Sequence, residues 1–308
     1  MRRILTSTST FDPTSFSLDD RAVLKRAGIQ VVHNPFGRKL TEDEAIALLD
    51  GAVGLIAGLE PLNARVLRSA PTLRGIARVG IGLDTVDLSA AAELGIHVMN
   101  TPEPPAQAVA ELTMGHILGM LRHIARVDRA IRAGNWKGEF GALLASKTVG
   151  IIGYGRIGRR VATLLEAFGA EVIVHDPHVM DAGATLVSLD ELLSTSDIVT
   201  LHVPYSSENH HLLNQQSIAM MKPGAIIVNI ARGGLIDEVA LANALQSGAL
   251  AGAALDCFED EPYSGPLTSF DNVQMTAHMG TYAIETRGQM ERQAAAQLVE
   301  HLRSIGEI

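Results

Sequence analysis

The amino-acid sequence predicts an α/β protein with two doubly wound parallel sheets, each covered by helices. Three observations support this fold class. Short apolar runs alternate with helical patterns along the whole chain, which is typical of parallel sheets covered on both faces. A glycine-rich turn joins one apolar run to a helical segment within residues 147–176. The length of 308 residues corresponds to two domains, at about 150 residues per domain.

The first 100 residues alternate between apolar runs expected to form strands and segments expected to form helices. Thr41 and Glu44 have the spacing of a capping box, which marks the start of one of these helices. The expected strands are residues 3–6, 29–33, 53–57, 76–79 and 97–99, and the expected helices are residues 18–26, 41–49, 62–67 and 88–94.

The alternation stops at residues 100–105, because Pro102, Pro104 and Pro105 cannot continue a helix or a central strand. We expect this segment to be the crossover between two domains. One long helix is expected over residues 108–133, which are rich in apolar side chains. Such a helix must be buried against something, and a second copy of the chain is one option, so we expect a homodimer.

Residues 147–176 contain an apolar run, a glycine-rich turn, a helical segment and a second apolar run. In such a βαβ unit, Gly153 allows a tight turn, Gly155 lets the backbone approach a pyrophosphate, and Gly158 permits close helix–sheet packing. The free N–H groups at the start of the helix favour an anion. Asp176 ends the second run, where a carboxylate accepts hydrogen bonds from both ribose hydroxyls and repels a 2′-phosphate. The stretch therefore predicts a dinucleotide site that prefers NAD over NADP.

Beyond residue 176 the alternation resumes and predicts a second doubly wound sheet. A last helix, from residue 284 onward, is expected to return to the first domain. The expected domains are therefore residues 1–100 with 285–308, and residues 101–284. The remaining expected strands are residues 198–202, 225–230, 249–255 and 273–276, and the remaining expected helices are residues 156–168, 189–193, 215–221 and 237–246.

Composition argues against several classes of protein. The single Cys257 excludes an internal disulfide framework and a cysteine-based zinc cluster, and it fits a reducing cytoplasm. No apolar run is long enough to span a membrane, and a net charge of −9 argues against nucleic-acid binding. No metal site is expected. His116 and His123 lie seven positions apart, whereas metal-binding histidines on one helix are usually four apart, and His210 and His211 are interpreted as exposed loop residues.

Polar side chains follow several expected strands of the second sheet. Arg232 follows the run AIIVNI, and Asp256 ends the run ALAGAAL. Glu261 lies five residues beyond Asp256, and His278 follows the run VQMTA. Ligands of open parallel sheets bind outside the carboxyl ends of the strands. An arginine, two acids and a histidine beside a dinucleotide site are therefore candidates for the chemistry.

Long motifs cover nearly the whole chain. In order, they are RVGIGLDTVDLSAA, MNTPEPPAQAVAE, TVGIIGYGRIGRR, HVPYSSENHHLLN, MKPGAIIVNIARGGLIDEVAL, AALDCFEDEP and TAHMG. With these motifs the sequence resembles the D-isomer-specific 2-hydroxyacid dehydrogenase family, and most of all its short phosphoglycerate-dehydrogenase-type members. The resemblance implies a flavodoxin-like substrate domain over residues 1–100 and 285–308. It also implies a Rossmann NAD-binding domain over residues 101–284.

The resemblance implies three groups of site residues. The catalytic group is Arg232, Glu261 and His278. The substrate-binding group is Arg78, Val79 and Gly80, in which Val79 and Gly80 offer backbone N–H groups to the substrate carboxylate. Asp256 orients the nicotinamide carboxamide. The full cofactor-binding group is Gly153, Tyr154, Gly155, Arg156, Ile157, Gly158, Asp176, Val203, Pro204, Ala231, Asp256 and Gly280.

The chemistry of a 2-hydroxyacid dehydrogenase accounts for these residue types. Hydride transfer to a 2-oxo carbon leaves charge on the oxygen, and His278 as imidazolium can supply the proton. Glu261 beside that imidazole favours its charged form. Arg232 can hold the carboxylate and polarise the carbonyl together, because its guanidinium is fork-shaped and always cationic.

One motif departs from the family. Phosphoglycerate-type members often carry an arginine at the end of a GLIxR run, and here residues 54–58 read GLIAG. Phosphoglycerate therefore stays an open alternative to other 2-hydroxy acids, with Arg38, Lys39 or Arg78 as substitutes. Two further alternatives are an NAD-sensing interaction protein of the same fold and a dehydrogenase acting on a phosphonate- or phosphite-type anion.

Overall fold

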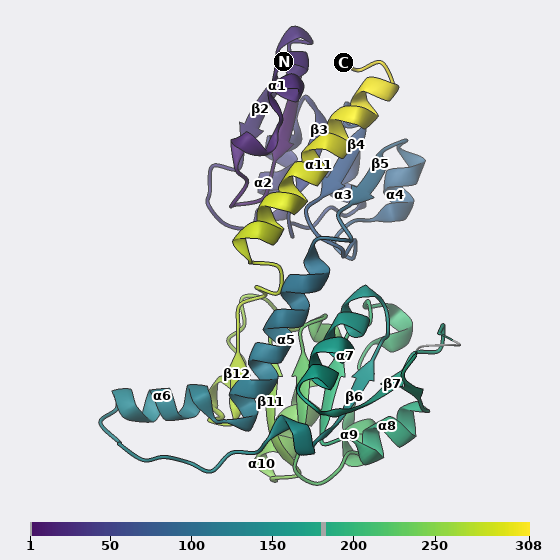
Figure 1. Cartoon of the computed structure of the whole chain (residues 1–308). Coiled ribbons are helices and arrows are strands. Elements are labelled where there is room, and N and C mark those ends of the chain that lie inside the picture. Colours follow the sequence, from purple (N-terminus) through teal and green to yellow (C-terminus); the bar gives the residue numbers. More distant parts are fainter. Residues whose placement is uncertain (1, 180–182) are drawn as a thin grey trace. The chain divides into compact units, whose positions relative to one another are not determined.

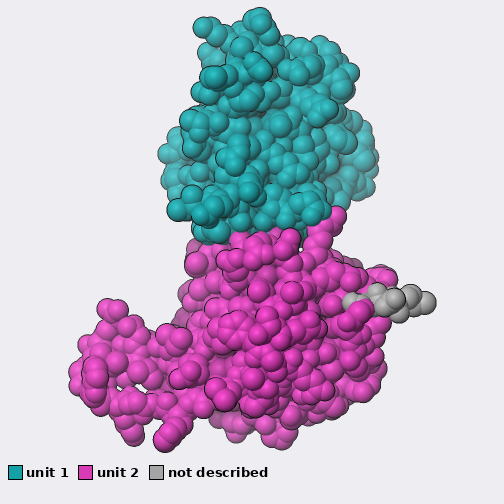
Figure 2. Space-filling model, viewed as in Figure 1, with its two compact units in different colours: residues 1–105, 281–308 teal, residues 106–280 magenta. Residues whose placement is uncertain are grey.

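The computed structural model describes residues 2–179 and 183–308. The chain forms two compact units, coloured separately in Figure 2. Unit 1 comprises Met1–Pro105 and Thr281–Ile308, and unit 2 comprises Ala106–Gly280. The chain therefore passes between the units twice, after Pro105 and after Gly280, rather than after residues 100 and 284.

Unit 1 is built on a parallel five-stranded sheet in the order β2-β1-β3-β4-β5, the order of flavodoxin-like folds. Every residue of the central strands β3 and β4 is buried, because helices cover both faces of the sheet. The strands are β1 Arg3–Thr6, β2 Gln30–His33, β3 Ala52–Ala57, β4 Gly75–Arg78 and β5 His97–Asn100.

Four helices of unit 1 come from its first segment, and the long helix α11 comes from the end of the chain (Figure 1). Gly54 in β3 and Gly75 in β4 make room for Leu298 of α11. The methyl carbons of Leu298 lie 3.0 and 2.9 Å from the positions that a Cβ would take at these glycines. The helices are α1 Leu18–Arg26, α2 Glu42–Leu49, α3 Ala64–Arg68, α4 Leu88–Glu93 and α11 Ile284–Ser304.

Unit 2 contains a parallel seven-stranded sheet in the order β12-β11-β10-β9-β6-β7-β8. From β6 the chain first adds strands on one side and then continues from β9 on the other. The edge between β6 and β9 is therefore the topological switch point, where doubly wound folds bind ligands. The strands are β6 Thr148–Ile152, β7 Glu171–His175, β8 Thr185–Leu186, β9 Ile198–Leu201, β10 Ala225–Asn229, β11 Leu250–Leu255 and β12 Val273–Met275.

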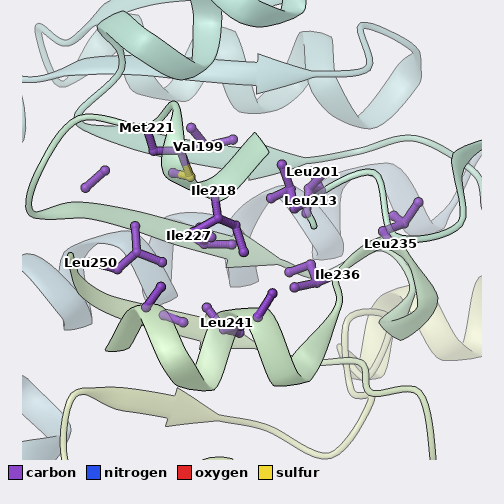
Figure 3. Packing of buried hydrophobic residues seen from close by; sticks show 14 of the residues in the cluster. Val199, Leu201, Leu213, Ile218, Met221, Ile227, Leu235, Ile236, Leu241 and Leu250 are labelled. Atoms are coloured by element: carbon purple, nitrogen blue, oxygen red, sulfur yellow. The ribbon is translucent and has the colours of Figure 1, made fainter. Parts of the chain in front are cut away.

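Aliphatic side chains bury both faces of this sheet. Leu201 of β9, Ile227 of β10 and Leu241 of α10 are each fully buried and belong to one cluster on one face (Figure 3). Residues of α5 and α7 form the cluster on the other face. The helices of unit 2 and the crossover are α5 Pro105–Leu121, α6 Ile124–Arg132, α7 Arg156–Ala167, α8 Leu189–Thr195, α9 Gln215–Ala219 and α10 Glu238–Gln246.

The prediction of one long helix over residues 108–133 is wrong. The segment is two helices, α5 and α6, and the chain turns between them at His123, which has a left-handed backbone with φ 57°. His123 therefore does not share a helix face with His116. Its Nε2 lies 3.1 Å from the carbonyl oxygen of Phe140, whereas His116 is buried against Gln274.

The structure confirms the predicted fold class of two parallel α/β sheets. The strands predicted in both halves are present with small shifts of their ends, and Thr41 and Glu44 form the expected capping box. The short edge strand β8 was not predicted, because Thr185–Leu186 is too short to show a periodic pattern.

Candidate active site

The glycine-rich turn between β6 and α7 fits a dinucleotide. A Cβ at Gly153, where φ is +95°, would lie 2.6 Å from the carbonyl oxygen of His202. A Cβ at Gly158 would lie 2.1 Å from the carbonyl oxygen of Gly153. Gly155 instead faces open space, with no described atom within 4 Å of its Cβ position, and no described side chain caps α7. The bare backbone at Gly155 and the uncapped N–H groups of α7 leave room for a pyrophosphate.

Asp176 lies at the end of β7 and holds the turn in place. Its Oδ2 accepts a hydrogen bond from the backbone N–H of Tyr154 at 2.8 Å, and its Oδ1 accepts one from His178 N–H at 2.9 Å. Each carboxylate oxygen accepts more than one hydrogen bond, and Asp176 is only half-buried, so both oxygens can still receive ribose hydroxyls. The guanidinium of Arg159 lies 4.5 Å from the centre of the Tyr154 ring and covers it.

Arg232 follows β10 on a turn that Asn229 shapes. The buried Asn229 side chain accepts a hydrogen bond from Ala231 N–H at 3.0 Å and donates one to the carbonyl of Arg232 at 2.8 Å. The next residue, Gly233, packs so closely that a Cβ on it would lie 1.9 Å from the backbone of Phe258. The turn that carries Arg232 is therefore fixed from both sides.

His278 and Glu261 form a pair at the carboxyl edge of the sheet. His278 Nδ1 lies 2.8 Å from Glu261 Oε2 and 3.0 Å from Oε1. Since Nδ1 faces the carboxylate, Nε2 is the ring nitrogen left to face a reacting oxygen. The backbone of His278 is left-handed, with φ 50°, a strained conformation for a residue with a side chain.

Asp256 holds the loop that carries His278. Its Oδ1 accepts hydrogen bonds from Thr276 Oγ1 at 2.6 Å and Met279 N–H at 2.8 Å, and its Oδ2 accepts one from Gly280 N–H at 2.8 Å. The Asp256 carbonyl also accepts the N–H of His278 at 2.8 Å. Asp256 is fully buried, and its carboxylate forms these hydrogen bonds with its own loop. The resemblance assigned the same carboxylate to the nicotinamide carboxamide.

In unit 1, the N–H groups of Val79 and Gly80, which were expected to bind the substrate carboxylate, have partners within the chain. The N–H of Val79 donates to the carbonyl of Ala57 at 3.0 Å, as part of the ladder between β3 and β4. The N–H of Gly80 donates to Thr101 Oγ1 at 2.8 Å. The Gly80 N–H also lies 3.0 Å from the carbonyl oxygen of Arg78, so both N–H groups are paired within unit 1. The Arg78 side chain is buried over this turn, where its Nη1 lies 2.3 Å from the Gly80 Cβ position.

The other expected cofactor residues lie along the carboxyl edge of the unit 2 sheet. Arg156 and Ile157 begin α7, Val203 and Pro204 follow β9, Ala231 follows β10, and Gly280 follows β12.

Two of the expected catalytic residues, Glu261 and His278, lie together with Cys257, and the Arg232 guanidinium donates a hydrogen bond from Nη1 to the carbonyl of Ala231 at 2.7 Å. Side-chain atoms of Cys257, Glu261 and His278 all lie within 4.8 Å of one another. Cys257 Sγ also lies 3.5 Å from the carbonyl oxygen of Ala231, the residue before Arg232. The buried Cys257 thus joins the turn after β10 to the His278–Glu261 pair.

A second group, His210, His211 and Glu259, also brings possible metal ligands within 4.8 Å of one another. Direct contacts account for it, since His211 Nε2 pairs with Glu259 Oε1 and the two histidine rings stack with centres 3.8 Å apart. We assign no metal to either group.

Three residues that shape the site were not singled out from the sequence: Thr101 at Gly80, Asn229 beneath Arg232, and Thr276 at Asp256. The sequence could have indicated Asn229 as a site residue, because it is a polar residue at the end of an apolar strand. It could not have indicated Thr101 or Thr276, since a threonine beside a strand end is common.

A helix long and apolar enough to cross a membrane is absent from the described part of the chain.

Comparisons with known proteins agree with this geometry. Residues 114–280 match the family model described as D-isomer specific 2-hydroxyacid dehydrogenase, NAD binding domain. A hydroxypyruvate reductase of Thermotoga maritima is 41% identical over 272 residues, which cover 85% of this chain and 88% of that protein. A D-3-phosphoglycerate dehydrogenase of Homo sapiens is 38% identical over 97% of this chain and 56% of the human protein.

Among solved structures, a D-lactate dehydrogenase of Aquifex aeolicus in complex with NAD and lactic acid superposes with a TM-score of 0.81. It is 28% identical, and the match covers 99% of this chain and 96% of that one. This chain spans about half the length of the D-3-phosphoglycerate dehydrogenases that it matches.

Proposed function

Because the chain belongs to the D-isomer specific 2-hydroxyacid dehydrogenase family of NAD-dependent oxidoreductases, we propose that His278, Glu261 and Arg232 interconvert a D-2-hydroxy acid and its 2-oxo acid. The observation that carries the proposal is the contact of His278 Nδ1 with Glu261 at 2.8 Å, on the sheet edge that also carries the dinucleotide turn. Such a pair provides a general acid–base whose second nitrogen is free to serve a substrate.

The described residues fit NAD, which when bound supplies or accepts the hydride. The bare backbone at Gly155 and the N–H groups of α7 would hold the pyrophosphate, and Asp176 would accept the ribose hydroxyls. Asp256 would act as a positioning residue, because its carboxylate holds the Thr276–Gly280 segment and with it the backbone of His278.

In the reductive direction, His278 would donate a proton from Nε2 to the substrate oxygen as charge develops there. Glu261 would stabilise the imidazolium through Nδ1 and fix its orientation. In the oxidative direction, neutral His278 would accept the hydroxyl proton at the same nitrogen. Arg232 would hold the substrate carboxylate and polarise the carbonyl, since its turn is fixed by Asn229 and Gly233.

We place the activity on a small 2-hydroxy acid, with 3-phosphoglycerate as the second candidate. The relatives reported above include a hydroxypyruvate reductase and D-3-phosphoglycerate dehydrogenases, which are named after a short 2-oxo acid and a short 2-hydroxy acid. In unit 1, Arg78 and the N–H of Gly80 are the groups proposed to contact the substrate.

The buried thiol of Cys257 suits a reducing compartment, and we place the enzyme in the cytoplasm.

A panel of 2-oxo acids with NADH and NADPH, followed at the nicotinamide absorbance, tests the activity. We expect turnover with NADH, and we expect Arg232→Ala to lower kcat/KM by roughly 10²–10³-fold, because a transition-state charge loses its cation. NADH affinity should stay within about threefold of the wild type, since Arg232 is not assigned to the cofactor. Arg68→Ala, at an exposed arginine of unit 1 paired with Glu93, is the matched control.

Two results would count against this reading. NADH binding without turnover of any panel member would favour the NAD-sensing interaction protein. Oxidation of phosphite by NAD⁺, with no 2-oxo acid reduced by NADH, would favour the inorganic-anion dehydrogenase. Full activity of Arg232→Ala would remove that residue from the mechanism.

The segment that begins with α6 is proposed to pair two copies of the chain. α6 has no buried residue, and it stands away from the sheet of unit 2 together with the segment that follows it (Figure 1). Trp136 is 88% exposed and Phe140 is fully exposed, although Arg126 pairs with Glu139 and His123 contacts the Phe140 carbonyl. An ordered segment with exposed aromatic side chains indicates an interface.

Sedimentation of the wild type and of a Trp136→Ser/Phe140→Ser double variant tests the dimer. We expect the wild type to sediment as two copies of the 32.7 kDa chain and the variant as one. Leu18→Ser, at an exposed apolar residue of unit 1, is the control and should leave the dimer intact. A monomeric wild type at micromolar concentration would contradict the proposal.

A further inference from the structure

A buried carboxylate lies at the carboxyl edge of the unit 1 sheet. Ser7 follows β1, Glu60 follows β3, and Arg78 ends β4, and these three strands are neighbours in the sheet. Glu60 is 1% exposed and Arg78 is 7% exposed. This edge is where a doubly wound sheet binds its ligand.

Hydrogen bonds fix the position of the Glu60 carboxylate. Ser7 Oγ donates to Oε1, and the backbone N–H of Gly58 lies 3.2 and 3.1 Å from Oε1 and Oε2. The register of the two strands sets Ala57 of β3 opposite Arg78 of β4, so Glu60 lies just beyond the strand pair that ends in the arginine. Burial raises the pKa of the Glu60 carboxyl, whereas the hydrogen bonds from Ser7 and Gly58 and, to a smaller extent, the charge of Arg78 lower it.

A carboxylate is not needed to satisfy these donors. A glutamine with its amide oxygen in the place of Oε1 would still accept hydrogen bonds from Ser7 and from Gly58 N–H, and would lose only the contact of Gly58 N–H with Oε2. Burying a carboxylate costs free energy unless a nearby positive charge compensates for it. The compensating charge at this edge is Arg78, which is also the group proposed to contact the substrate.

A second observation concerns Thr8, the residue after Ser7. Its hydroxyl is buried and makes no hydrogen bond to any described residue. The Thr8 backbone lies beside Gly58, whose Cβ position is 3.4 Å from the Thr8 Cα and 3.0 Å from Glu60 Oε2. Buried hydroxyls normally have a partner, and a hydroxyl on the substrate would supply one.

We propose that Glu60 determines substrate specificity: its carboxylate offsets the charge of Arg78, so that unit 1 selects 2-oxo acids with an uncharged, hydroxylated distal end over those carrying a phosphate. The proposal rests on the proposed function and names its substrate class. A phosphate dianion at this edge would meet an arginine whose charge is already balanced, together with a carboxylate that repels it.

The test compares hydroxypyruvate with 3-phosphohydroxypyruvate, using NADH, at low ionic strength. We expect the wild type to favour hydroxypyruvate in kcat/KM by at least about tenfold. Glu60→Gln should shift that ratio toward the phosphorylated substrate by about tenfold, mainly through KM, because the arginine is no longer balanced. Thr8→Val should weaken turnover of hydroxypyruvate relative to pyruvate, and Glu93→Gln, at an exposed residue of unit 1, should change neither ratio.

A double variant separates specificity from folding. If Glu60 acts through Arg78, Glu60→Gln should leave the substrate ratio unchanged in an Arg78→Gln background. A ratio that stays within twofold of the wild type in Glu60→Gln alone would overturn the proposal. So would a wild type that prefers the phosphorylated substrate, or an equal shift in both backgrounds.

Calorimetric binding of D-glycerate and 3-phosphoglycerate to the NAD complex gives the same comparison without turnover. If these ligands bind with the expected preference but no substrate turns over, the proposed function fails and the specificity assignment stands. If turnover occurs and the preference is absent in every variant, the specificity assignment fails alone. If neither ligand binds to any variant, the specificity assignment also fails.

Discussion

At the residue scale, His278 illustrates how the site maintains a strained backbone. Its φ of 50° costs about 1–2 kcal/mol for a residue with a side chain. Asp256 offsets this cost, because its carboxylate accepts three hydrogen bonds from the Thr276–Gly280 segment and its carbonyl accepts a fourth, from the N–H of His278. The left-handed turn directs the imidazole toward Glu261, so the strain and the His278–Glu261 contact have one structural cause.

His202, at the exit of β9, makes stability depend on pH. Burial lowers the pKa of His202 to about 3, and its Nε2 lies 2.9 Å from Thr200 Oγ1. A histidine whose pKa is lowered in the folded state adds stability above its unfolded pKa of about 6.5, and loses it as pH falls from there toward 3. Between pH 7 and pH 5 we expect the free energy of unfolding to fall about 2 kcal/mol further in the wild type than in His202→Gln.

Urea titrations at the two pH values measure this difference. His178→Gln, at an exposed histidine after β7, should keep the wild-type dependence on pH. Parallel curves for the wild type and His202→Gln would show that His202 is not kept neutral by burial.

The positions of the site residues could be predicted from the sequence, but their hydrogen-bonding partners could not. Arg232, Asp256 and His278 each follow an apolar run, and that pattern alone places them on the ligand edge of a parallel sheet. The hydrogen bonds of Asp256 with its loop and of Gly80 with Thr101 join residues that are twenty or more positions apart in the sequence. The periodic pattern of a sequence shows which face of a strand or helix a residue lies on, but not which distant residue it forms a hydrogen bond with.

At the element scale, periodicity was reliable for strands and less reliable for the ends of helices. The strands of both sheets are buried on two faces, so their apolar runs are continuous and easy to recognise. The break between α5 and α6 has no glycine or proline, and the turn at His123 is made by a residue that ordinarily continues a helix. A local pattern therefore could not reveal that turn.

The turn between β6 and α7 offers a matched pair of substitutions. Gly155→Ala should fold like the wild type, because its Cβ meets no described atom within 4 Å, but it should weaken NADH binding by about tenfold or more, since the methyl group occupies the path of the pyrophosphate. Gly158→Ala should instead destabilise the fold by several kcal/mol, because its Cβ would lie 2.1 Å from a backbone oxygen.

Thermal unfolding and NADH fluorescence titration separate the two effects. A Gly155→Ala variant with wild-type affinity for NADH would show that the pyrophosphate does not bind at this turn. A Gly158→Ala variant with wild-type stability would show that the helix start can shift to accept a methyl group.

At the scale of the whole molecule, the chain builds its two units in different ways. Unit 2 is one continuous segment, Ala106–Gly280, with its own sheet and its own buried clusters on both faces. Unit 1 needs both ends of the chain, because Leu298 and its neighbours on α11 fill one face of the sheet made by the first segment. A contiguous unit with a complete core can fold independently, whereas a unit that lacks α11 exposes that face.

Residues 106–280 expressed alone should therefore fold cooperatively and bind NADH through the turn at Gly155, with affinity within about tenfold of the full chain. The fragment should not turn over any 2-oxo acid, because Arg78 and Gly80 of unit 1 are missing. Residues 1–105 alone should fold poorly, and a peptide covering residues 281–308 should restore their structure, which circular dichroism would follow. A fragment 106–280 that binds no NADH would mean that unit 1 contributes to the cofactor site, and one that reduces a 2-oxo acid would remove Arg78 and Gly80 from the mechanism.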